Sequence, residues 1–281
     1  MAQSLGKAST VTITLRPSRG WVPVNLRELW SYRELLYFLT WREIKVRYKQ
    51  TVLGFAWAII QPFMMMIVFT LFFGNLAKVP SEGVPYPIFN YTAMVAWTYF
   101  ANTTTFSGNS LVQNTALISK VYFPRMTVPL APVLAFLLDF AIAFVILIGM
   151  MLYYGIYPTV MTLFLPLLVI LMMLTASGVG MLLAALNANY RDIRYTLQFL
   201  VQFWMFASPV VYPVSMLPEK YHLIYAINPM AGVIEGFRSA LLGTTAFPTQ
   251  MLLVSTLTSI IIFIIGALYF RRTERYFADV I

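Results

Sequence analysis

Residues 32–62 read YRELLYFLTWREIKVRYKQTVLGFAWAIIQP. Within this stretch a basic amphipathic helix pattern runs without a break into an uncharged apolar one. Apolar residues such as Trp30, Trp41 and Tyr48 recur at helical steps, while cations such as Arg42 fall on the other side. Cations and aromatic side chains arranged in this way suit an anionic lipid surface. The stretch therefore predicts a chain that lies on a membrane and then enters it.

The composition of the whole chain agrees with this prediction. Of its 281 residues, 60% are hydrophobic and only 10% are charged, which describes a chain whose solvent is mostly lipid. The net charge of +9 does not indicate nucleic acid, because the basic residues lie beside apolar segments rather than in a polar domain. The absence of cysteine excludes disulfides, thiolate catalysis and cysteine metal sites. We therefore expect a membrane protein with membrane lipids, and no nucleic acid, as partners.

Segments of about 20 apolar residues are long enough to cross a bilayer. Five are evident, and we infer a sixth, 89–111, because omitting it would put Lys120 and Arg125 on the wrong side of the membrane. The six expected spans are 53–74, 89–111, 128–154, 160–185, 196–216 and 250–270. Sixteen of the nineteen Lys and Arg residues then lie on the side of both chain ends, as the positive-inside rule requires. We expect an all-α membrane protein with one domain, 26–281, after an N-terminal tail, 1–25, and with both termini cytoplasmic.

Several kinds of chemistry are missing from the sequence. The chain has no G-x-x-x-x-G-K-[ST] phosphate loop, so we do not expect it to hydrolyse ATP itself. The acidic residues Asp139, Asp192 and Asp279 stand alone, and the single His222 has no Cys or second His with which to share a metal. We therefore expect no catalytic residue, no metal site and no cofactor bound by this chain. Asp139 lies in an apolar run, so it should be paired, protonated or near the end of its span.

Two short charged turns face the cytoplasm in this topology. The first, 113–125, reads QNTALISKVYFPR, and the turn after the fourth span reads NANYRDIRY. In the first, Asn114 or Thr115 can cap a brief helix that runs through Tyr122 and that Pro124 stops. Turns of this kind can press on a soluble partner. The alternative is a capped turn whose cations only anchor the membrane topology.

Polar and aromatic side chains within the expected spans could line a transport path. A polar stripe recurs at steps of three and four along the second span and ends at Gln113. Such a stripe should face protein or water rather than lipid, and its uncharged groups suit sugars, although interhelical hydrogen bonding is the alternative. Aromatic rings could stack on sugar faces, but a role at the lipid interface explains most of them equally well. The candidate channel residues are Phe55, Phe63, Phe69, Asn102, Thr105, Asn109, Phe199, Phe203 and Tyr212.

The segment 218–243 is too charged to cross the bilayer, and we expect it to dip into the membrane and return. Pro229 is a good start for a short helix there and Gly243 a good end. Glu235 and Arg238 are three residues apart and can pair. We interpret the segment as short re-entrant external helices that form a gate, with a surface loop as the alternative. The candidate gate residues are Tyr221, Pro229, Ile234, Glu235 and Arg238.

Five stretches carry a family resemblance: YRELL, REIKVRYKQTVLGFAWAIIQP, LISKVYFPR, NANYRDIRY and INPMAGVIEGFRSALLG. In this order they resemble the membrane (permease) subunit of type-2 ABC exporters for polysaccharides, most nearly the O-antigen permeases, with teichoic acid exporter permeases as near relatives. The resemblance covers nearly everything from Leu26 to Phe270. It implies a homodimer with two ABC ATPase subunits that exports lipid-linked polysaccharide across the cell inner membrane. ATP and magnesium would be bound by the partner ATPase subunits.

The resemblance also assigns parts to two segments. The amphipathic helix 26–50 would be an interface helix along the inner membrane surface, and its candidate residues are Trp30, Arg33, Tyr37, Trp41, Arg42, Lys45, Arg47 and Tyr48. The first cytoplasmic turn would hold the helix that couples to the ATPase. The candidate coupling residues are Asn114, Thr115, Leu117, Ile118, Ser119, Lys120, Val121, Tyr122, Phe123 and Arg125.

Two rival functions remain open at the level of the sequence. One is an exporter of the same architecture that carries drugs or other small lipophilic molecules, since the width of a channel cannot be read from a sequence. The other is a membrane-embedded glycan-processing enzyme. An enzyme of that kind should show clustered acids or histidines on one membrane face, and the sequence has no such cluster.

Overall fold

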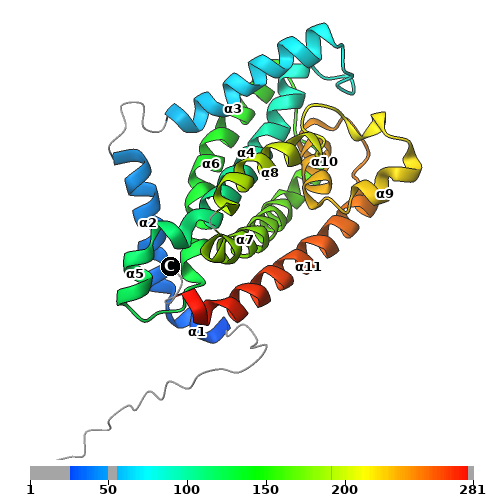
Figure 1. Ribbon diagram of the computed structural model, residues 1–281. Helices are drawn as coiled ribbons and strands as arrows, with labels where there is room; N and C mark the ends of the chain where they lie inside the picture. The colour runs from blue at the N-terminus through cyan, green and yellow to red at the C-terminus, as the bar shows by residue number, and fades with distance from the viewer. Residues whose placement is uncertain (1–25, 50–55, 191, 278–281) are drawn as a thin grey trace, which may run out of the picture.

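The computed structural model describes residues 26–49, 56–190 and 192–277, and in them the chain forms helices joined by turns, with no β-strand (Figure 1). The all-α fold expected from the sequence is confirmed for this part of the chain. The expected tail, 1–25, and the candidate channel residue Phe55 lie outside the described residues.

The longer α-helices are α2 (Arg33–Lys49), α3 (Ala56–Phe69), α4 (Tyr86–Gln113), α6 (Thr127–Tyr154), α7 (Leu165–Asn189), α8 (Ile193–Phe206), α10 (Pro229–Leu242) and α11 (Thr249–Thr273). Most of them follow the expected spans closely. The short α-helices are α1 (Leu26–Ser31), α5 (Thr115–Lys120) and α9 (His222–Tyr225). A π-helical turn, η1 (Thr70–Leu76), and the 3₁₀ turns η2 (Val160–Phe164), η3 (Val214–Met216), η4 (Glu219–Tyr221) and η5 (Glu274–Tyr276) extend or join them.

Four helical stretches in the described part of the chain are long and apolar enough to cross a membrane. They are Ala56–Leu76, Thr127–Tyr154, Val160–Asn189 and Thr249–Tyr276. These stretches support a multi-pass membrane protein. The other two expected spans correspond to α4, which is 28 residues long and carries the polar stripe, and to α8.

The fifth expected span, 196–216, is not one continuous helix. α8 has 14 residues and ends at Phe206, which gives about 21 Å at 1.5 Å per residue, less than the ~30 Å hydrocarbon core of a bilayer. Pro209 and Pro213 follow, and neither can donate the backbone hydrogen bond that a continuing helix needs. The prediction gave the length of the apolar run more weight than these prolines.

α7 lies at the centre of the bundle, in contact with α4 on one side and α11 on the other (Figure 1). Small residues permit both contacts, because they let helix backbones approach closely. A side chain at Gly180 would clash with Ser107 of α4, and one at Gly178 would lie 2.6 Å from the Cα atom of Phe263 in α11. On α11, a side chain at Gly266 would meet the backbone of Gly178. The bundle is therefore held by backbone approach within one subunit.

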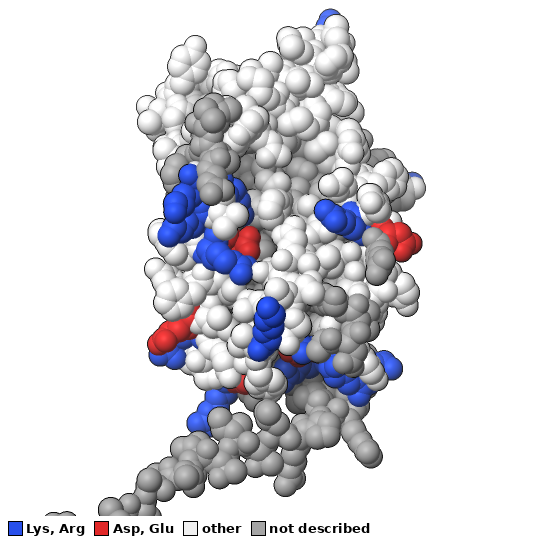
Figure 2. Space-filling view, turned by 60° about the vertical axis from the view of Figure 1, so that its left-hand side comes forward, with Lys and Arg blue, Asp and Glu red and all other residues white. Residues whose placement is uncertain are grey.

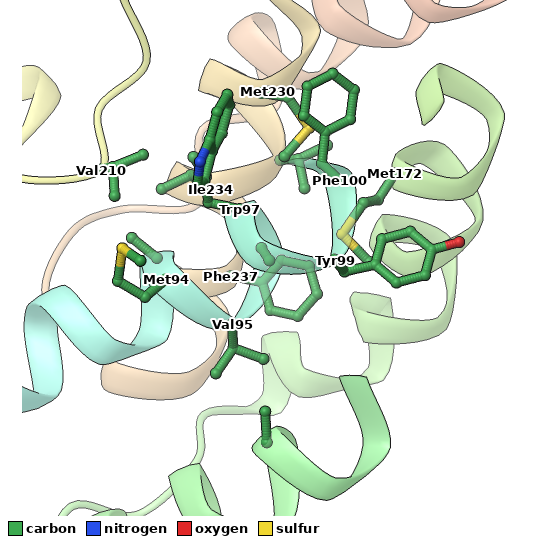
Figure 3. Close-up of a cluster of buried hydrophobic side chains, with 14 of the residues drawn as sticks. Met94, Val95, Trp97, Tyr99, Phe100, Met172, Val210, Met230, Ile234 and Phe237 are labelled. Atoms are coloured by element: carbon green, nitrogen blue, oxygen red, sulfur yellow. The ribbon is translucent and has the colours of Figure 1, made fainter. Parts of the chain in front are cut away.

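The largest hydrophobic cluster joins α4, α7 and α10. Figure 3 shows Trp97 and Phe100 of α4, Met172 of α7, and Ile234 and Phe237 of α10 side by side. All five side chains are buried. α10 is therefore part of the core of the subunit rather than a surface loop, and its bounds, from Pro229 to the positive-φ Gly243, are those expected from the sequence.

The expected interface helix is divided at Tyr32 into α1 and α2. α2 packs on α6 and buries Leu39 in a cluster that also holds side chains from α5 and α11. The aromatic side chains that were expected to face lipid, among them Trp30, Tyr37 and Trp41, are exposed on the single chain. The helix thus packs through leucine and leaves Trp30, Tyr37 and Trp41 exposed, whereas Tyr48 is half-buried against α6.

The contact between α7 and α11 predicts unequal effects of two glycine substitutions. Gly266→Ala should destabilise the protein by about 1–3 kcal/mol, the usual cost of overpacking, because the new methyl group meets the backbone of Gly178. Gly149→Ala on α6 is the matched control, since nothing lies within 4 Å of its added Cβ, and it should be neutral or slightly stabilising. Apparent melting temperatures of the detergent-solubilised variants measure both, and equal values would contradict the close packing.

Candidate functional site

The segment between α4 and α6 has one face packed against the bundle and another exposed to solvent. Ile118 and Phe123 are buried, whereas Val121 and Tyr122 are 53% and 68% exposed. α5 ends at Lys120 and Val121 is extended, so the expected helix through Tyr122 is too long. Pro124 disfavours helical backbone in the residue before it, which shortens the helix. Of the other candidate coupling residues, Ser119 and Lys120 are exposed, and Asn114, Thr115, Leu117 and Arg125 are half-buried.

Two polar contacts fix the ends of this turn. At its start, Asn114 Oδ1 accepts a hydrogen bond from Arg42 Nη2 at 2.6 Å, so the expected capping role of this side chain is wrong, and α5 has no side-chain cap. At its end, the backbone N–H of Arg125 donates to Glu274 Oε1 at 2.9 Å, and the Arg125 guanidinium donates to the backbone carbonyl of Glu274. Arg125 is thus bound within its own chain.

Glu274 connects this turn to α1 through Arg271. Arg271 Nη1 donates to Glu274 Oε2 at 2.9 Å, and Arg271 Nη2 donates to Glu28 Oε2 of α1 at 3.0 Å. We call the group formed by Glu28, Arg125, Arg271 and Glu274 the basal clamp. It joins α1, the α5–α6 turn and the end of α11, so a push on the turn reaches all three elements.

A cavity of about 250 Å³ lies between α2, α3, α4 and α6. On its wall Asp139 accepts a hydrogen bond from Arg47 Nη1 at 2.9 Å and a second from the Tyr48 hydroxyl. The Arg47 guanidinium lies 3.6 Å from the ring centroid of Phe136. Of the three alternatives expected for Asp139, the structure shows the paired one, and its partners belong to the expected interface helix. The ion pair therefore ties α2 to α6.

The polar stripe of α4 divides into two parts. Thr105 Oγ1 donates to the carbonyl of Ala101 at 2.7 Å, and Asn109 Nδ2 donates to the carbonyl of Thr105 at 2.9 Å. Asn109 Oδ1 also accepts a hydrogen bond from Asn187 of α7 at 3.1 Å, so this part forms the structural bonds that were the alternative. Asn102 lines the cavity, and no hydrogen bond joins its side chain to another described residue.

The candidate aromatic channel residues have different surroundings. Phe199 and Phe203 of α8 are 71% and 65% exposed, and their stacked rings lie 6.4 Å apart between centroids. Phe63 is also exposed and Tyr212 is half-buried. Phe69 is buried in the hydrophobic core, which argues against a place on a channel wall.

Arg238 binds the non-helical backbone that follows the end of α8. Its guanidinium donates to four backbone carbonyls, those of Phe89 at 3.3 Å, Pro209 at 2.7 Å, Val210 at 2.8 Å and Tyr212 at 3.3 Å. It also lies 3.6 Å from the ring centroid of Phe89. The carbonyls of Pro209, Val210 and Tyr212, which follow the end of α8, are thus bound by one side chain that is completely buried.

The other candidate gate residues differ in their surroundings. Glu235 Oε2 is 3.9 Å from Arg238 Nη1, so the expected pair is present at a longer distance than a hydrogen bond. Pro229 and Ile234 are buried, and Tyr221 is exposed. A contact between two subunits at Ile234 would therefore require α10 to leave the core.

Burial also changes the proton affinity of one group outside the spans. Burial and the bond to Asp139 raise the pKa of Tyr48, so its hydroxyl stays protonated and can donate.

Sequence reasoning did not identify several residues of these sites. Arg47 and Asp139 were each singled out but not as a pair, because 92 positions separate them. Glu274, 149 positions from Arg125, gave no local signal. Gln61 and its amide in an apolar run could have been noticed as a polar residue that needs a partner or a cavity.

Charge is distributed unequally over the surface. Figure 2 shows Lys and Arg from the middle of the view down to its lower end, the side on which α1, α2 and α5 lie in Figure 1, whereas the upper end is almost uncharged. The positive-inside rule associates such a basic end with the cytoplasm.

Residues 34–242 match the family model of the ABC-2 type transporter. The chain belongs to this family and is a multi-pass membrane subunit of a transporter rather than an enzyme. Membership implies a partner ATPase.

The relatives are transport proteins of similar length. The chain is similar to the O-antigen export system permease protein RfbA of Myxococcus xanthus, with 27% identity over 257 residues that cover 90% of this chain and 98% of the relative. The protein of the same name from Klebsiella pneumoniae is 26% identical over 249 residues, which cover 88% and 95% of the two chains. The polysialic acid transport protein KpsM of Escherichia coli is 22% identical over 236 residues, covering 83% and 91%.

The ion pair beside the cavity predicts coupled stability effects. Asp139→Ala should destabilise the protein by up to about 3–5 kcal/mol, because it leaves the mostly buried Arg47 charge without its carboxylate. Arg47→Met combined with Asp139→Leu should recover much of that loss, since an apolar pair leaves no uncompensated charge. A double-mutant cycle on apparent melting temperature measures the coupling, and strictly additive losses would contradict a direct pair.

Proposed function

We propose that the chain is the channel-forming subunit of an ATP-driven exporter that moves lipid-linked polysaccharide from the cytoplasm across the inner membrane. The observation that carries this proposal is the likeness, over most of both lengths, to permeases named for O-antigen export and for polysialic acid transport. The transporter would be a homodimer of this chain with two ABC ATPase subunits, which bind the ATP and magnesium.

The proposed subunit has six spans and two cytoplasmic ends. α4 and α8 are added to the four long apolar stretches, with α8 and the turn held by Arg238 together making the fifth crossing. Irregular backbone is tolerated at membrane depth when protein buries it, and the carbonyls bound by Arg238 meet that condition. The basic end of the surface in Figure 2 would face the cytoplasm.

The exposed part of the α5–α6 turn would dock on the ATPase. Val121 and Tyr122 offer apolar contact there, while the basal clamp transmits movement to α1 and α11. Arg125 would act by positioning the turn. α2 would remain the interface helix, since its exposed aromatic residues suit the membrane surface.

The transport path would run between two subunits. Phe199 and Phe203 form an exposed aromatic face on α8, and aromatic rings offer weak contacts to sugar faces that allow a polymer to slide. Phe63 on α3 would contribute to the same path. α9 and α10 would form the external gate, with Tyr221 on the accessible side and Arg238 as the fixed point.

The proposed function predicts where polymer accumulates. In cells that lack this gene, newly made lipid-linked polysaccharide should stay inside, where antibody or lectin reaches it only after permeabilisation, and the intact gene should restore surface polymer. Normal surface polymer in a deletion strain without a second exporter would contradict the proposal and favour the small-molecule exporter.

The docking surface predicts different consequences for two substitutions. Tyr122→Ala should reduce co-purification of the ATPase while leaving the melting temperature of the permease unchanged, because the side chain is exposed. Arg125→Glu should lower both, because it places a second carboxylate against Glu274. Tyr157→Ala is the matched control, an exposed tyrosine in the loop after α6. Unchanged co-purification for both Tyr122→Ala and Arg125→Glu would remove the coupling role.

A further inference from the structure

The cavity between α2, α3, α4 and α6 contains polar groups that the fold does not use. Gln61, Thr98 and Asn102 line it, Gln61 exposed and the other two half-buried, and none of the three side chains has a hydrogen-bond partner among the described residues. On α4 the hydroxyls of Thr92 and Thr105 are bonded to the carbonyls of Ile88 at 2.8 Å and of Ala101 at 2.7 Å, whereas those of Thr103 and Thr104 are buried without a partner. Polar groups inside a membrane bundle normally bond to protein or line a cavity that holds a polar guest.

The charges on the cavity wall exclude a strongly ionic guest. Arg47 and Asp139 are 2.9 Å apart and compensate each other. A phosphate placed against Arg47 would also meet the Asp139 carboxylate, and a cation would meet the guanidinium. The wall therefore favours a neutral molecule with several hydroxyl groups, for which planar amide, guanidinium and carboxylate groups are suitable hydrogen-bond partners.

Aromatic rings form the remaining walls. The cavity residues with rings are Tyr48, Trp57, Tyr99, Phe106, Phe136 and Phe140. Trp57 is 54% exposed, at the edge of the cavity where a guest would enter. The volume of about 250 Å³ lies below the roughly 300–1,000 Å³ of pockets for drug-sized ligands, which suits a guest the size of one sugar ring.

We propose that this cavity is a subsite for one neutral pyranose unit of the exported glycan. Gln61, Thr98 and Asn102 bind its hydroxyl groups, and Trp57 covers its apolar face. The inference rests on the proposed function, because that function supplies the sugar. The subsite adjoins the interface helix, so it receives the glycan on the side of α2 rather than on the aromatic face of α8.

Thiol labelling tests the subsite, because the natural chain has no cysteine. Asn102→Cys and Gln61→Cys are each expressed with the partner ATPase in cells whose glycan synthesis can be switched on or off, and the ATPase is inactivated so that substrate remains bound. N-ethylmaleimide is the probe. Gln250→Cys, at the exposed start of α11, is the control. Labelling at positions 102 and 61 should slow several-fold when glycan is made, while labelling at position 250 stays constant.

Three results would overturn the subsite. Labelling that is fast both with and without glycan would mean that the cavity is empty. Labelling that is slow in both conditions would mean that a phospholipid fills the cavity or that the cavity is closed. A change at position 250 as well would mean a general effect. The proposed function is read separately, in the same strain with active ATPase and the natural permease. Absence of surface polymer there would contradict export itself, whereas export with unprotected cysteines would contradict only the subsite.

Discussion

The end of the fold that holds α10 depends on the hydrogen bonds of Arg238. Lipid offers no partner to a backbone carbonyl, so a chain that stops being helical at membrane depth must satisfy its carbonyls from within. α8 stops early, and Arg238 binds the carbonyls of Pro209, Val210 and Tyr212 together with that of Phe89. A buried guanidinium is stable there because acceptors and an aromatic face surround it. α10 is thereby fastened to both α4 and the end of α8.

A second group of polar side chains connects the elements at the opposite end of the fold. The two groups differ in how deeply they are buried. The basal clamp joins half-buried charges around Glu274, where partial exposure to water lowers the cost of separating them. Between the two ends, α7 contacts its neighbours backbone to backbone, so it is suited to move as a rigid body with them. The Arg47–Asp139 pair ties α2 to α6, beside the cavity where the interface helix approaches the bundle.

The sequence predicted the features that depend on local pattern. The apolar spans, the bounds of α10 and the pairing of Asp139 followed from helix length, proline and glycine positions, and the cost of a lone charge in lipid. The predictions were wrong where contacts between residues far apart in the chain decide the local structure. α8 ends early, because Arg238 donates hydrogen bonds to the carbonyls of the non-helical turn that follows it. The Asn114 side chain accepts a hydrogen bond from Arg42 instead of capping α5. The candidate channel residues have different surroundings for the same reason, since Asn109 is bonded to α7 whereas Asn102 lines a cavity.

Transport in a defined membrane tests the central claim, that this chain forms the path for a lipid-linked polysaccharide. Inside-out vesicles containing this chain and its partner ATPase would be loaded with the lipid-linked glycan in the outer leaflet. Added ATP should move the glycan into the lumen, out of reach of an added glycan-degrading enzyme, and vesicles without this chain should show no such protection. Glycan that stays fully digestible while the complex hydrolyses ATP would contradict the account.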